Sequence, residues 1–215
     1  MGWLHRPAAA EAAAGGGVVG RLSGENDSAT HDSPALAEIF ASIDAEHPNR
    51  VLDLGPASRV NLEFYSGFAS GVRIAHLLRG DDLKKASESD EGFFVSLLDR
   101  LSPSGDETFG LILAWDILDH LTDEQPSILA HHLAAVAERG TRVHVMTTTA
   151  HTMPAASTHF EIEGPGHLVY RPTTEERITA PNPPPAQVER WLDPFRISRS
   201  VILRHGIREF LAVLD

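Results

Sequence analysis

The sequence predicts an α/β fold, in which a mostly parallel β-sheet has helices on both faces and the chain ends in an antiparallel hairpin. Two apolar runs, 51–54 and 109–114, have the length of buried parallel strands. Stretches with helical apolar spacing follow both runs. Near the C-terminus, the alternating segments 195–203 and 207–214 flank His205-Gly206, which is a hairpin turn signal.

Composition limits the class of protein. A chain of 215 residues with 42% hydrophobic residues is long enough for one domain with a sizeable core. The absence of cysteine excludes disulfides and thiolate metal sites, and it is compatible with a cytoplasmic location. The formal charge of −12 disfavours nucleic acid and anionic membrane surfaces as partners. No apolar run approaches the roughly 20 residues that span a bilayer, and the histidine spacing predicts no metal site.

Residues 1–33 are rich in Ala, Gly, Ser and Asp, and such a segment buries too little apolar surface to offset the entropy of ordering it. We therefore predict a flexible tail, with one ordered domain over 34–215. Ser33 is placed to cap the first helix, and Pro34 fits its first turn. The apolar face of this helix comprises Leu36, Ile39, Phe40 and Ile43.

The segment from Val51 to Asn61 predicts a strand, a tight turn and the start of a helix. The strand ends at Gly55-Pro56, and the stretch 60–68 then has the apolar spacing of a helical face. Such a turn directs backbone N–H groups and a helix N-terminus at one point, where a polar or anionic part of a small molecule can bind.

The alternating stretch 71–77 predicts a second strand. In a dinucleotide-type site the end of this strand carries a carboxylate for the ribose hydroxyls, and His76 stands near that place. A carboxylate accepts two hydroxyl hydrogen bonds, whereas a neutral imidazole has one acceptor nitrogen. Asp81 or Asp82 can compensate from the following loop; the alternative is that His76 is hydrogen-bonded locally and has no ligand.

The sequence predicts fewer strands in the middle of the chain than a complete parallel sheet with helices on both faces would have. Residues 93–101 favour a short helix over a third strand. After the central strand at 109–114, Thr122 and Gln125 form a capping-box pattern, and the helix that they open is expected to continue to Gly140. Residues 141–147 alternate like a further strand.

Between this strand and the C-terminal hairpin we expect an insertion. Residues 160–163 and 167–170 alternate around Gly164-Pro-Gly166, which predicts a hairpin or extended insert. The proline-rich stretch 172–185 is expected to cross the surface over the strand ends, and 187–192 to form a short helix.

Two motifs resemble the class I S-adenosylmethionine-dependent methyltransferases. The run Asp53-Leu-Gly55-Pro-Ala57-Ser-Arg59-Val-Asn61 is similar to their first motif: Asp53, Gly55 and Asn61 match, while Ala57 and Arg59 replace the second and third glycines.

The second motif lies in the run 111–121, which resembles the fourth strand and following loop of the small-molecule branch of the family. Asp116 and Asp119-His120-Leu121 match it, while Gly110 replaces the usual aspartate after Phe109.

The resemblance implies a Rossmann-like fold, S-adenosylmethionine as cofactor and a small-molecule or peptide-like methyl acceptor. In the implied site, Asp53, Gly55 and Ala57 line the methionine and ribose side, and Asp116 lies at the floor. Asp119 or His120 is the candidate general base. The remaining cofactor-binding candidates are Asn61, His76 near the ribose and Asp99 near the adenine amino group.

Two other functions stay open on the sequence alone. A noncatalytic relative would keep the fold as a binding or interaction module, and Arg59, His76 and the shortened middle favour it. A nicotinamide-binding oxidoreductase is third, because both the complete glycine fingerprint and its acidic ribose partner are missing.

Overall fold

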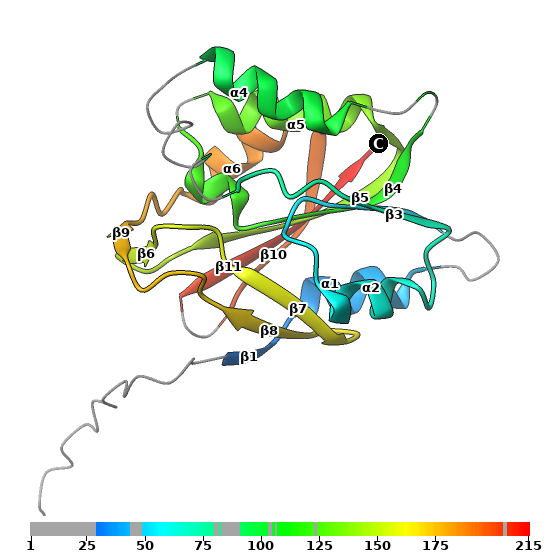
Figure 1. Cartoon of the computed structure of the whole chain (residues 1–215), viewed down its shortest axis with the longest axis horizontal. Helices are drawn as coiled ribbons and strands as arrows, with labels where there is room; N and C mark the ends of the chain where they lie inside the picture. Colours follow the sequence, from blue (N-terminus) through cyan, green and yellow to red (C-terminus); the bar gives the residue numbers. More distant parts are fainter. Residues whose placement is uncertain are drawn as a thin grey trace, which may run out of the picture.

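A six-stranded sheet forms the centre of the molecule (Figure 1). The computed structural model describes residues 29–43, 49–79, 82, 91–102, 105, 107–122, 124–203 and 206–215. The strand order in this sheet is β10-β11-β5-β4-β2-β3. Its strands are β2 (Arg50–Asp53), β3 (Gly71–Ile74), β4 (Phe109–Trp115), β5 (Ala137–Thr148), β10 (Phe195–Ile202) and β11 (Ile207–Leu214).

Strand directions in this sheet confirm the predicted fold class. β3, β2, β4 and β5 are parallel, and each of these four except β5 is followed by helical structure before the next strand. β11 then runs antiparallel to β5, and β10 runs antiparallel to β11, so the predicted C-terminal hairpin closes one edge. Parallel strands end at the same edge of a sheet, and at this edge a ligand site is expected.

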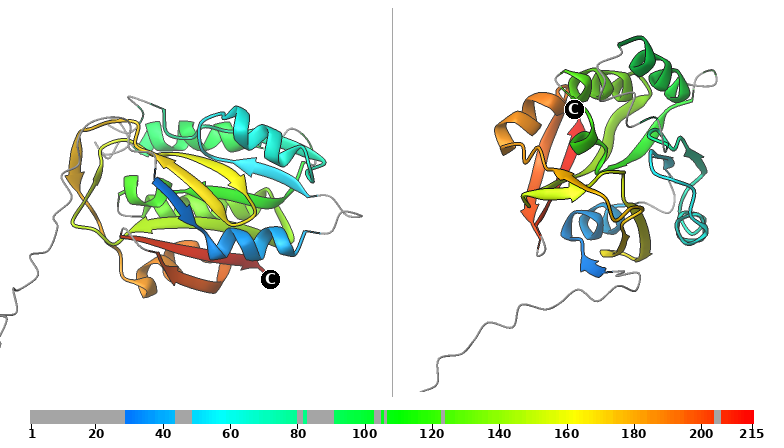
Figure 2. Two further views of the ribbon diagram at one scale, coloured as in Figure 1. Left: turned by 90° about the horizontal axis from the view of Figure 1, so that it is seen from below. Right: turned by 60° about the vertical axis from the view of Figure 1, so that its left-hand side comes forward.

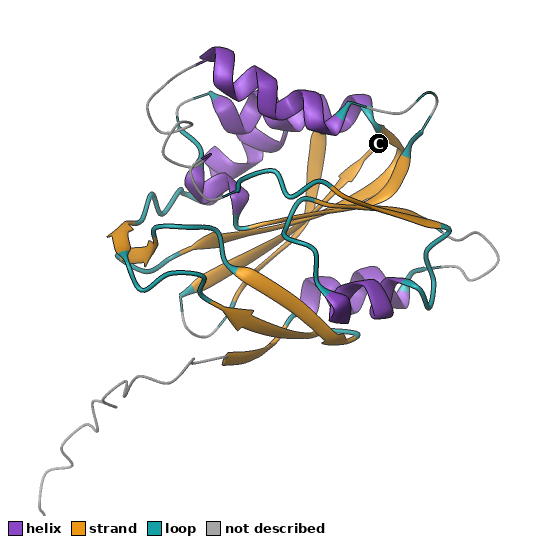
Figure 3. Ribbon diagram, viewed as in Figure 1, coloured by secondary structure: helices purple, strands orange, loops and turns teal. Residues whose placement is uncertain are grey.

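Helices cover both faces of the sheet, as Figure 3 shows. Side chains alternate between these faces along β4: Ile112 and Ala114 enter one apolar core, while Leu111, Leu113 and Trp115 enter the other. The first core lies under α4 (Glu91–Leu98), α5 (Gln125–Ala135) and α6 (Pro185–Leu192).

The second core is covered by two helices and by a small antiparallel sheet with the strand order β1-β8-β7. This sheet packs below the central sheet in Figure 1. The covering elements are α1 (Pro34–Ala41), α2 (Arg59–Tyr65), β1 (Ala29–Asp32), β7 (His159–Gly164) and β8 (His167–Arg171). The predicted hairpin around Gly164–Gly166 is therefore confirmed, with β7 and β8 as its strands.

The predicted start of α1 is confirmed. Ser33 is its N-cap, with Oγ accepting a hydrogen bond from the backbone N–H of Leu36 at 3.2 Å, and Pro34 is its first residue. The predicted tail, residues 1–33, includes residues that are ordered, because residues 29–32 form β1 and pair with β8. The rest of the predicted tail lies outside the described residues.

Two predictions for the middle of the chain have different outcomes. The helix expected over 93–101 is confirmed: α4 leads into the 3₁₀ helix η1 (Asp99–Leu101), and β3 forms the edge of the described sheet. The helix expected to reach Gly140 ends at Ala135 instead. Phe109 N–H donates to Val136 O at 2.9 Å, so pairing with β4 begins there, and Gly140 lies within β5 with φ 87°.

The proline-rich stretch contains a strand that was not predicted. β9 (Arg177–Thr179) pairs with β6 (Thr152–Pro154), the first strand after β5, and together they form a separate two-stranded sheet. Figure 2 shows this pair at one end of the molecule, beyond the central sheet.

Among the described helices, none is both long and apolar enough to cross a bilayer.

Candidate functional site

Two hollows lie where the parallel strands end. The larger, which we call the strand-end cavity, has a volume of about 360 Å³. The smaller, which we call the polar pocket, has a volume of about 70 Å³. Both combine residues that follow the strands of the central sheet with residues of the insertion after β5.

The strand-end cavity is built by three strand ends and a cover. Gly55, His76 and Ile117 follow β2, β3 and β4 respectively. The cover comes from residues 156–159 and from Thr173. No carboxylate is found among the described residues that line it. The lining residues are Leu54, Gly55, Pro56, His76, Leu78, Ile117, Ala156, Ser157, His159 and Thr173.

Asp53 lies behind the glycine turn and does not line the cavity. Its carboxylate accepts hydrogen bonds from the backbone N–H of Gly55 at 2.8 Å, from Tyr65 Oη at 2.7 Å and from Trp115 Nε1 at 2.6 Å. Burial raises the pKa of Asp53, and these hydrogen bonds partly offset that effect. The residue thus fixes the turn to α2 and to the end of β4.

Trp115 packs against the turn, a contact that no sequence motif indicated. Its backbone is left-handed (φ 52°), and its indole stacks on Phe160 with ring centroids 5.2 Å apart. A Cβ at Gly55 would lie 2.9 Å from the indole, so Trp115 leaves no room for a side chain at this position. The expected supply of backbone donors is also reduced, since Gly55 N–H is already bonded and Pro56 has none.

Three further candidates lie away from the cavity. Asn61 is buried, with Nδ2 donating to Phe160 O at 2.9 Å and Oδ1 accepting from the backbone N–H of Ile162 at 2.8 Å. Ala57 is exposed at the turn, and Asp99 is exposed in η1. None of the three is a lining residue of either hollow.

His76 lines the strand-end cavity, as expected from its place after the second strand. Its backbone is left-handed (φ 42°), and its pKa is lowered by burial and then by the nearby Arg79 guanidinium. The neutral imidazole is therefore favoured. Asp82 is engaged by Arg79 N–H at 3.2 Å and by Arg100 Nη1 at 2.7 Å, and Asp81 lies outside the described residues.

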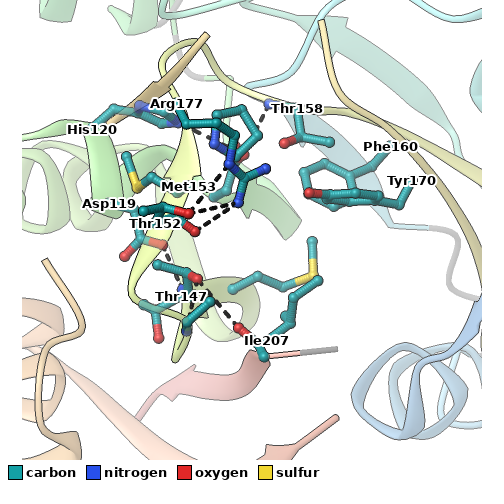
Figure 4. A pocket seen from close by; sticks show the side chains of 16 residues that line it. Asp119, His120, Thr147, Thr152, Met153, Thr158, Phe160, Tyr170, Arg177 and Ile207 are labelled. Carbon is teal, nitrogen blue, oxygen red and sulfur yellow. Dashed lines mark hydrogen bonds and ion pairs between the residues drawn. The ribbon is translucent and has the colours of Figure 1, made fainter. Parts of the chain in front are cut away.

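Asp119 belongs to the polar pocket, shown in Figure 4. It is 7% exposed, and Oδ2 accepts a hydrogen bond from the backbone N–H of Thr148 at 2.5 Å. Burial raises its pKa to about 7, the Thr148 bond opposes this rise, and the charge of Asp116 adds to it. A carboxyl group with such a pKa can hold or release a proton near neutral pH.

Asp116 and His120 line the polar pocket, and Asp116 is bonded to one residue of each hollow. Asp116 accepts hydrogen bonds from Ser157 Oγ at 2.6 Å and from the backbone N–H of Thr158 at 2.9 Å, and His120 Nε2 lies 3.8 Å from Asp116 Oδ2. Burial alone would raise the pKa of Asp116, but the contacts with His120, Ser157 and Thr158 outweigh it and lower the pKa. Ser157 lines the strand-end cavity and Thr158 the polar pocket, so Asp116 links the two hollows.

The structure therefore brings Asp116, Asp119 and His120 together, and it places Gly55 and His76 at the neighbouring cavity. The insertion contributes side chains that the sequence did not suggest. They are Ser157, His159 and Thr173 at the cavity, and Tyr170 and Arg177 at the pocket. The prediction that 172–185 crosses over the strand ends was the one available signal for this region.

A comparison with solved structures found methyltransferases similar to this chain over most of its length. The glycopeptide N-methyltransferase MtfA complexed with (S)-adenosyl-L-methionine is 15% identical, with a TM-score of 0.44 over 86% of this chain and 95% of that chain. Magnesium protoporphyrin IX methyltransferase (ChlM) from Synechocystis PCC 6803 is 14% identical, with a TM-score of 0.48 over 84% of this chain and 80% of that chain. Comparisons of the sequence with models of protein families and with curated proteins found no match. The fold itself is defined by the strand order given above.

Proposed function

We propose that this protein is an S-adenosylmethionine-dependent methyltransferase that acts on a small-molecule or peptide-like acceptor. The cofactor is assigned to the strand-end cavity and the acceptor to the polar pocket. The observation that carries the proposal is the pair of hydrogen bonds to Asp116: Ser157, one donor, lines the strand-end cavity, and Thr158, the other, lines the polar pocket. Methyl transfer needs its two ligands held close together and aligned.

The cavity fits the cofactor in position and size. It lies beyond the carboxyl ends of parallel strands, and its volume of about 360 Å³ falls within the range of about 300–1,000 Å³ that is usual for small-molecule sites. His76 would accept one ribose hydroxyl, and Ser157 and Thr173 would supply hydroxyl groups to the polar edges of the ligand. When bound, S-adenosylmethionine would supply an already electrophilic methyl group, so the protein has mainly to orient the acceptor and exclude water.

In this proposal Asp119 and His120 act on the acceptor. Asp119 Oδ1 takes up the proton that the acceptor releases, because burial keeps the pKa of this carboxyl group close to 7. Asp116 holds His120 in place, together with Ser157 and Thr158. Asp116 is therefore a positioning residue, whereas Asp119 is the candidate catalytic residue.

Calorimetry with S-adenosylhomocysteine and S-adenosylmethionine tests the cofactor site. We expect the wild type to bind with a dissociation constant in the micromolar range. Ala156→Phe fills part of the cavity and should weaken binding at least tenfold. Ala186→Phe makes the same change at an exposed position of α6 and is the matched control. Melting temperatures of both variants show whether they are folded.

Each result decides a separate point. Binding that Ala156→Phe leaves unchanged would place the ligand outside the strand-end cavity. No binding by the wild type at millimolar concentrations of either ligand would contradict the methyltransferase proposal. It would then favour the second candidate, a noncatalytic binding module.

The second candidate, a noncatalytic binding module, is supported by the polar groups of the strand-end cavity, because they offer a cofactor fewer hydrogen bonds than expected. Gly55 N–H is bonded to Asp53, Pro56 has no N–H, and His76 stands where a carboxylate is expected. If the wild type does not bind, His76→Asp is the informative variant, because aspartate tolerates the left-handed backbone at this position. Recovered binding would support an ancestral cofactor site that this substitution disabled.

A further inference from the structure

Two buried polar atoms of the polar pocket have no hydrogen-bond partner among the described residues. They are Asp119 Oδ1 and Thr147 Oγ1. Both residues line the pocket, and they are 7% and 1% exposed, respectively. A buried polar atom without a partner costs about 1–3 kcal/mol, so two such atoms on residues that line one pocket call for a ligand, a reacting group or a water molecule that completes their hydrogen bonds.

The chemistry of these atoms defines what they can bind. A carboxylate oxygen only accepts hydrogen bonds, and a hydroxyl oxygen can accept them, so the complementary ligand is one that donates. The other carboxylate of the pocket, Asp116, is already engaged by Ser157 and Thr158. Around them lie apolar and aromatic side chains, Met146, Met153, Phe160 and Tyr170.

Arg177 also lines the polar pocket, but its guanidinium makes no hydrogen bond to Asp119 Oδ1 or Thr147 Oγ1. Arg177 reaches in from β9, but the contacts of its guanidinium are with Thr152: Nη2 lies 2.8 Å from the carbonyl oxygen and 3.2 Å from Oγ1, and Nε lies 3.4 Å from Oγ1. Figure 4 shows these contacts beside Asp119. The guanidinium thus borders the pocket and leaves Asp119 Oδ1 without a donor.

We propose that the polar pocket binds the amino group of the methyl acceptor, with N–H groups donating to Asp119 Oδ1 and Thr147 Oγ1. Its role as the acceptor site rests on the proposed function, but the binding of an amine does not. An amine brings two or three donors, whereas an alcohol brings one and a carboxylate none. Its positive charge when protonated is favoured by the carboxylate of Asp119.

The size of the pocket limits the ligand further. A volume of about 70 Å³ exceeds the roughly 10–15 Å³ that one water needs, but it is well below the 300 Å³ at which small-molecule sites usually start. Only a terminal amino group and a short stem can enter. The pocket therefore selects an unbranched primary or N-methylated amine, and the rest of the acceptor stays outside.

The test uses n-propylamine as the probe on the full chain at pH 8, where Asp119 is mostly ionised. The backbone amide of Thr148 is the reporter in a ¹H–¹⁵N NMR titration, because it donates to Asp119 Oδ2. We expect a saturable shift with n-propylamine in the millimolar range, and no saturable shift with propionate or 1-propanol at the same concentrations. Equal shifts with 1-propanol, or none with the amine, would overturn the proposal.

Variants separate the pocket from general charge effects. Asp119→Asn should weaken amine binding about tenfold or more, since it removes a charged acceptor, and Thr147→Val should weaken it several-fold. Glu189→Gln removes a carboxylate that is exposed in α6 and should change nothing. Unchanged amine affinity in Asp119→Asn, with the variant folded by its melting temperature, would also overturn the proposal.

The same samples distinguish this proposal from the methyltransferase assignment. S-adenosylhomocysteine affinity should be unaffected by Asp119→Asn, because Asp119 does not line the strand-end cavity. Amine binding without S-adenosylhomocysteine binding would support the amine pocket and contradict the methyltransferase. S-adenosylhomocysteine binding without amine binding would do the reverse.

Discussion

Asp53, the last residue of β2, and Asp119, in the short 3₁₀ helix after β4, are both buried carboxyl groups, but they have different hydrogen-bond partners. Both oxygens of Asp53 accept hydrogen bonds, from Gly55, Tyr65 and Trp115. Asp119 has one partner, Thr148, for Oδ2 and none among the described residues for Oδ1. At the residue scale, Asp53 therefore stabilises the fold, whereas Asp119 is available for a ligand.

This difference predicts opposite effects of the same substitution. The pKa of Asp119 is about 7 in the folded protein against 3.8 in the unfolded chain, so the wild type loses stability as pH rises from about 4 to 7. The full loss is up to about 4 kcal/mol, at 1.36 kcal/mol per pKa unit. Asp119→Asn lacks this loss. Its melting temperature should equal that of the wild type near pH 4 and exceed it by several degrees at pH 8, as measured by calorimetry.

Asp53→Asn is the contrasting variant. An amide NH₂ would face donors that now point at a carboxylate oxygen, so we expect destabilisation by about 1–3 kcal/mol at pH 8. This effect does not depend on a cofactor, and loss of ligand binding in Asp53→Asn would not identify a ligand contact. A gain of stability in Asp53→Asn, or none in Asp119→Asn at pH 8, would contradict the assigned roles.

At the scale of elements, the side chain of Asn61 fastens the helix after the glycine turn to the small sheet. Asn61 of α2 bonds to Phe160 O and to the N–H of Ile162, both in β7. An amide side chain matches a peptide group, since it has one donor side and one acceptor side. The same strand supplies Phe160, which stacks on Trp115, so α2, β7 and the end of β4 form one packed unit.

Removing this side chain should loosen β7 locally. Asn61→Ala leaves two buried backbone groups without partners, and we expect a loss of about 2–4 kcal/mol in the free energy of unfolding. Hydrogen exchange of the Ile162 amide should accelerate in the variant. Asn61→Asp keeps the acceptor and should protect this amide better than alanine does. Glu63→Ala, on the exposed side of α2, is the control that should leave the exchange unchanged.

At the scale of the whole molecule, Glu209 joins the beginning of the domain to its end. It is a fully buried residue of β11, where Oε1 accepts a hydrogen bond from Ser33 Oγ and lies 3.2 Å from His144 Nε2. Oε2 accepts from the backbone N–H of Ala35 at 3.3 Å. Burial alone would raise the pKa of Glu209, but the contacts with His144, Ser33 and Ala35 lower it. One carboxylate thus holds the N-terminus of α1 against β5 and β11.

Glu209→Gln should therefore destabilise the domain as a whole. Its NH₂ group would oppose one of the present donors, at a cost of about 2–4 kcal/mol. A lowered pKa contributes stability above the unfolded value of 4.5, and this contribution is lost as pH falls through the folded pKa. The difference from the wild type in denaturant unfolding should be largest at pH 6–8 and shrink below pH 4. A difference that is the same at both pH values would contradict an ionised Glu209.

The sequence alone determined the strands of the central sheet, the glycine turn, the cap of α1 by Ser33 and the C-terminal hairpin, but not β1, β6 or β9. These features depend on periodicity and turn chemistry within about ten neighbouring residues, so each is readable locally. The predicted end of α5 at Gly140 was wrong. The helix ends earlier because Val136 pairs with Phe109 of β4.

Only the tertiary structure decided what the site residues contact. Asp53 meets Trp115, Asn61 meets Phe160 and Asp116 meets Ser157, and each of these contacts joins residues far apart in the chain. The burial that raises the pKa of Asp119 also depends on segments far apart in the chain, and so do the strand-end cavity and the polar pocket. Burial and hydrogen-bond partners depend on how distant segments pack, whereas a motif specifies only the side chains that its own segment supplies.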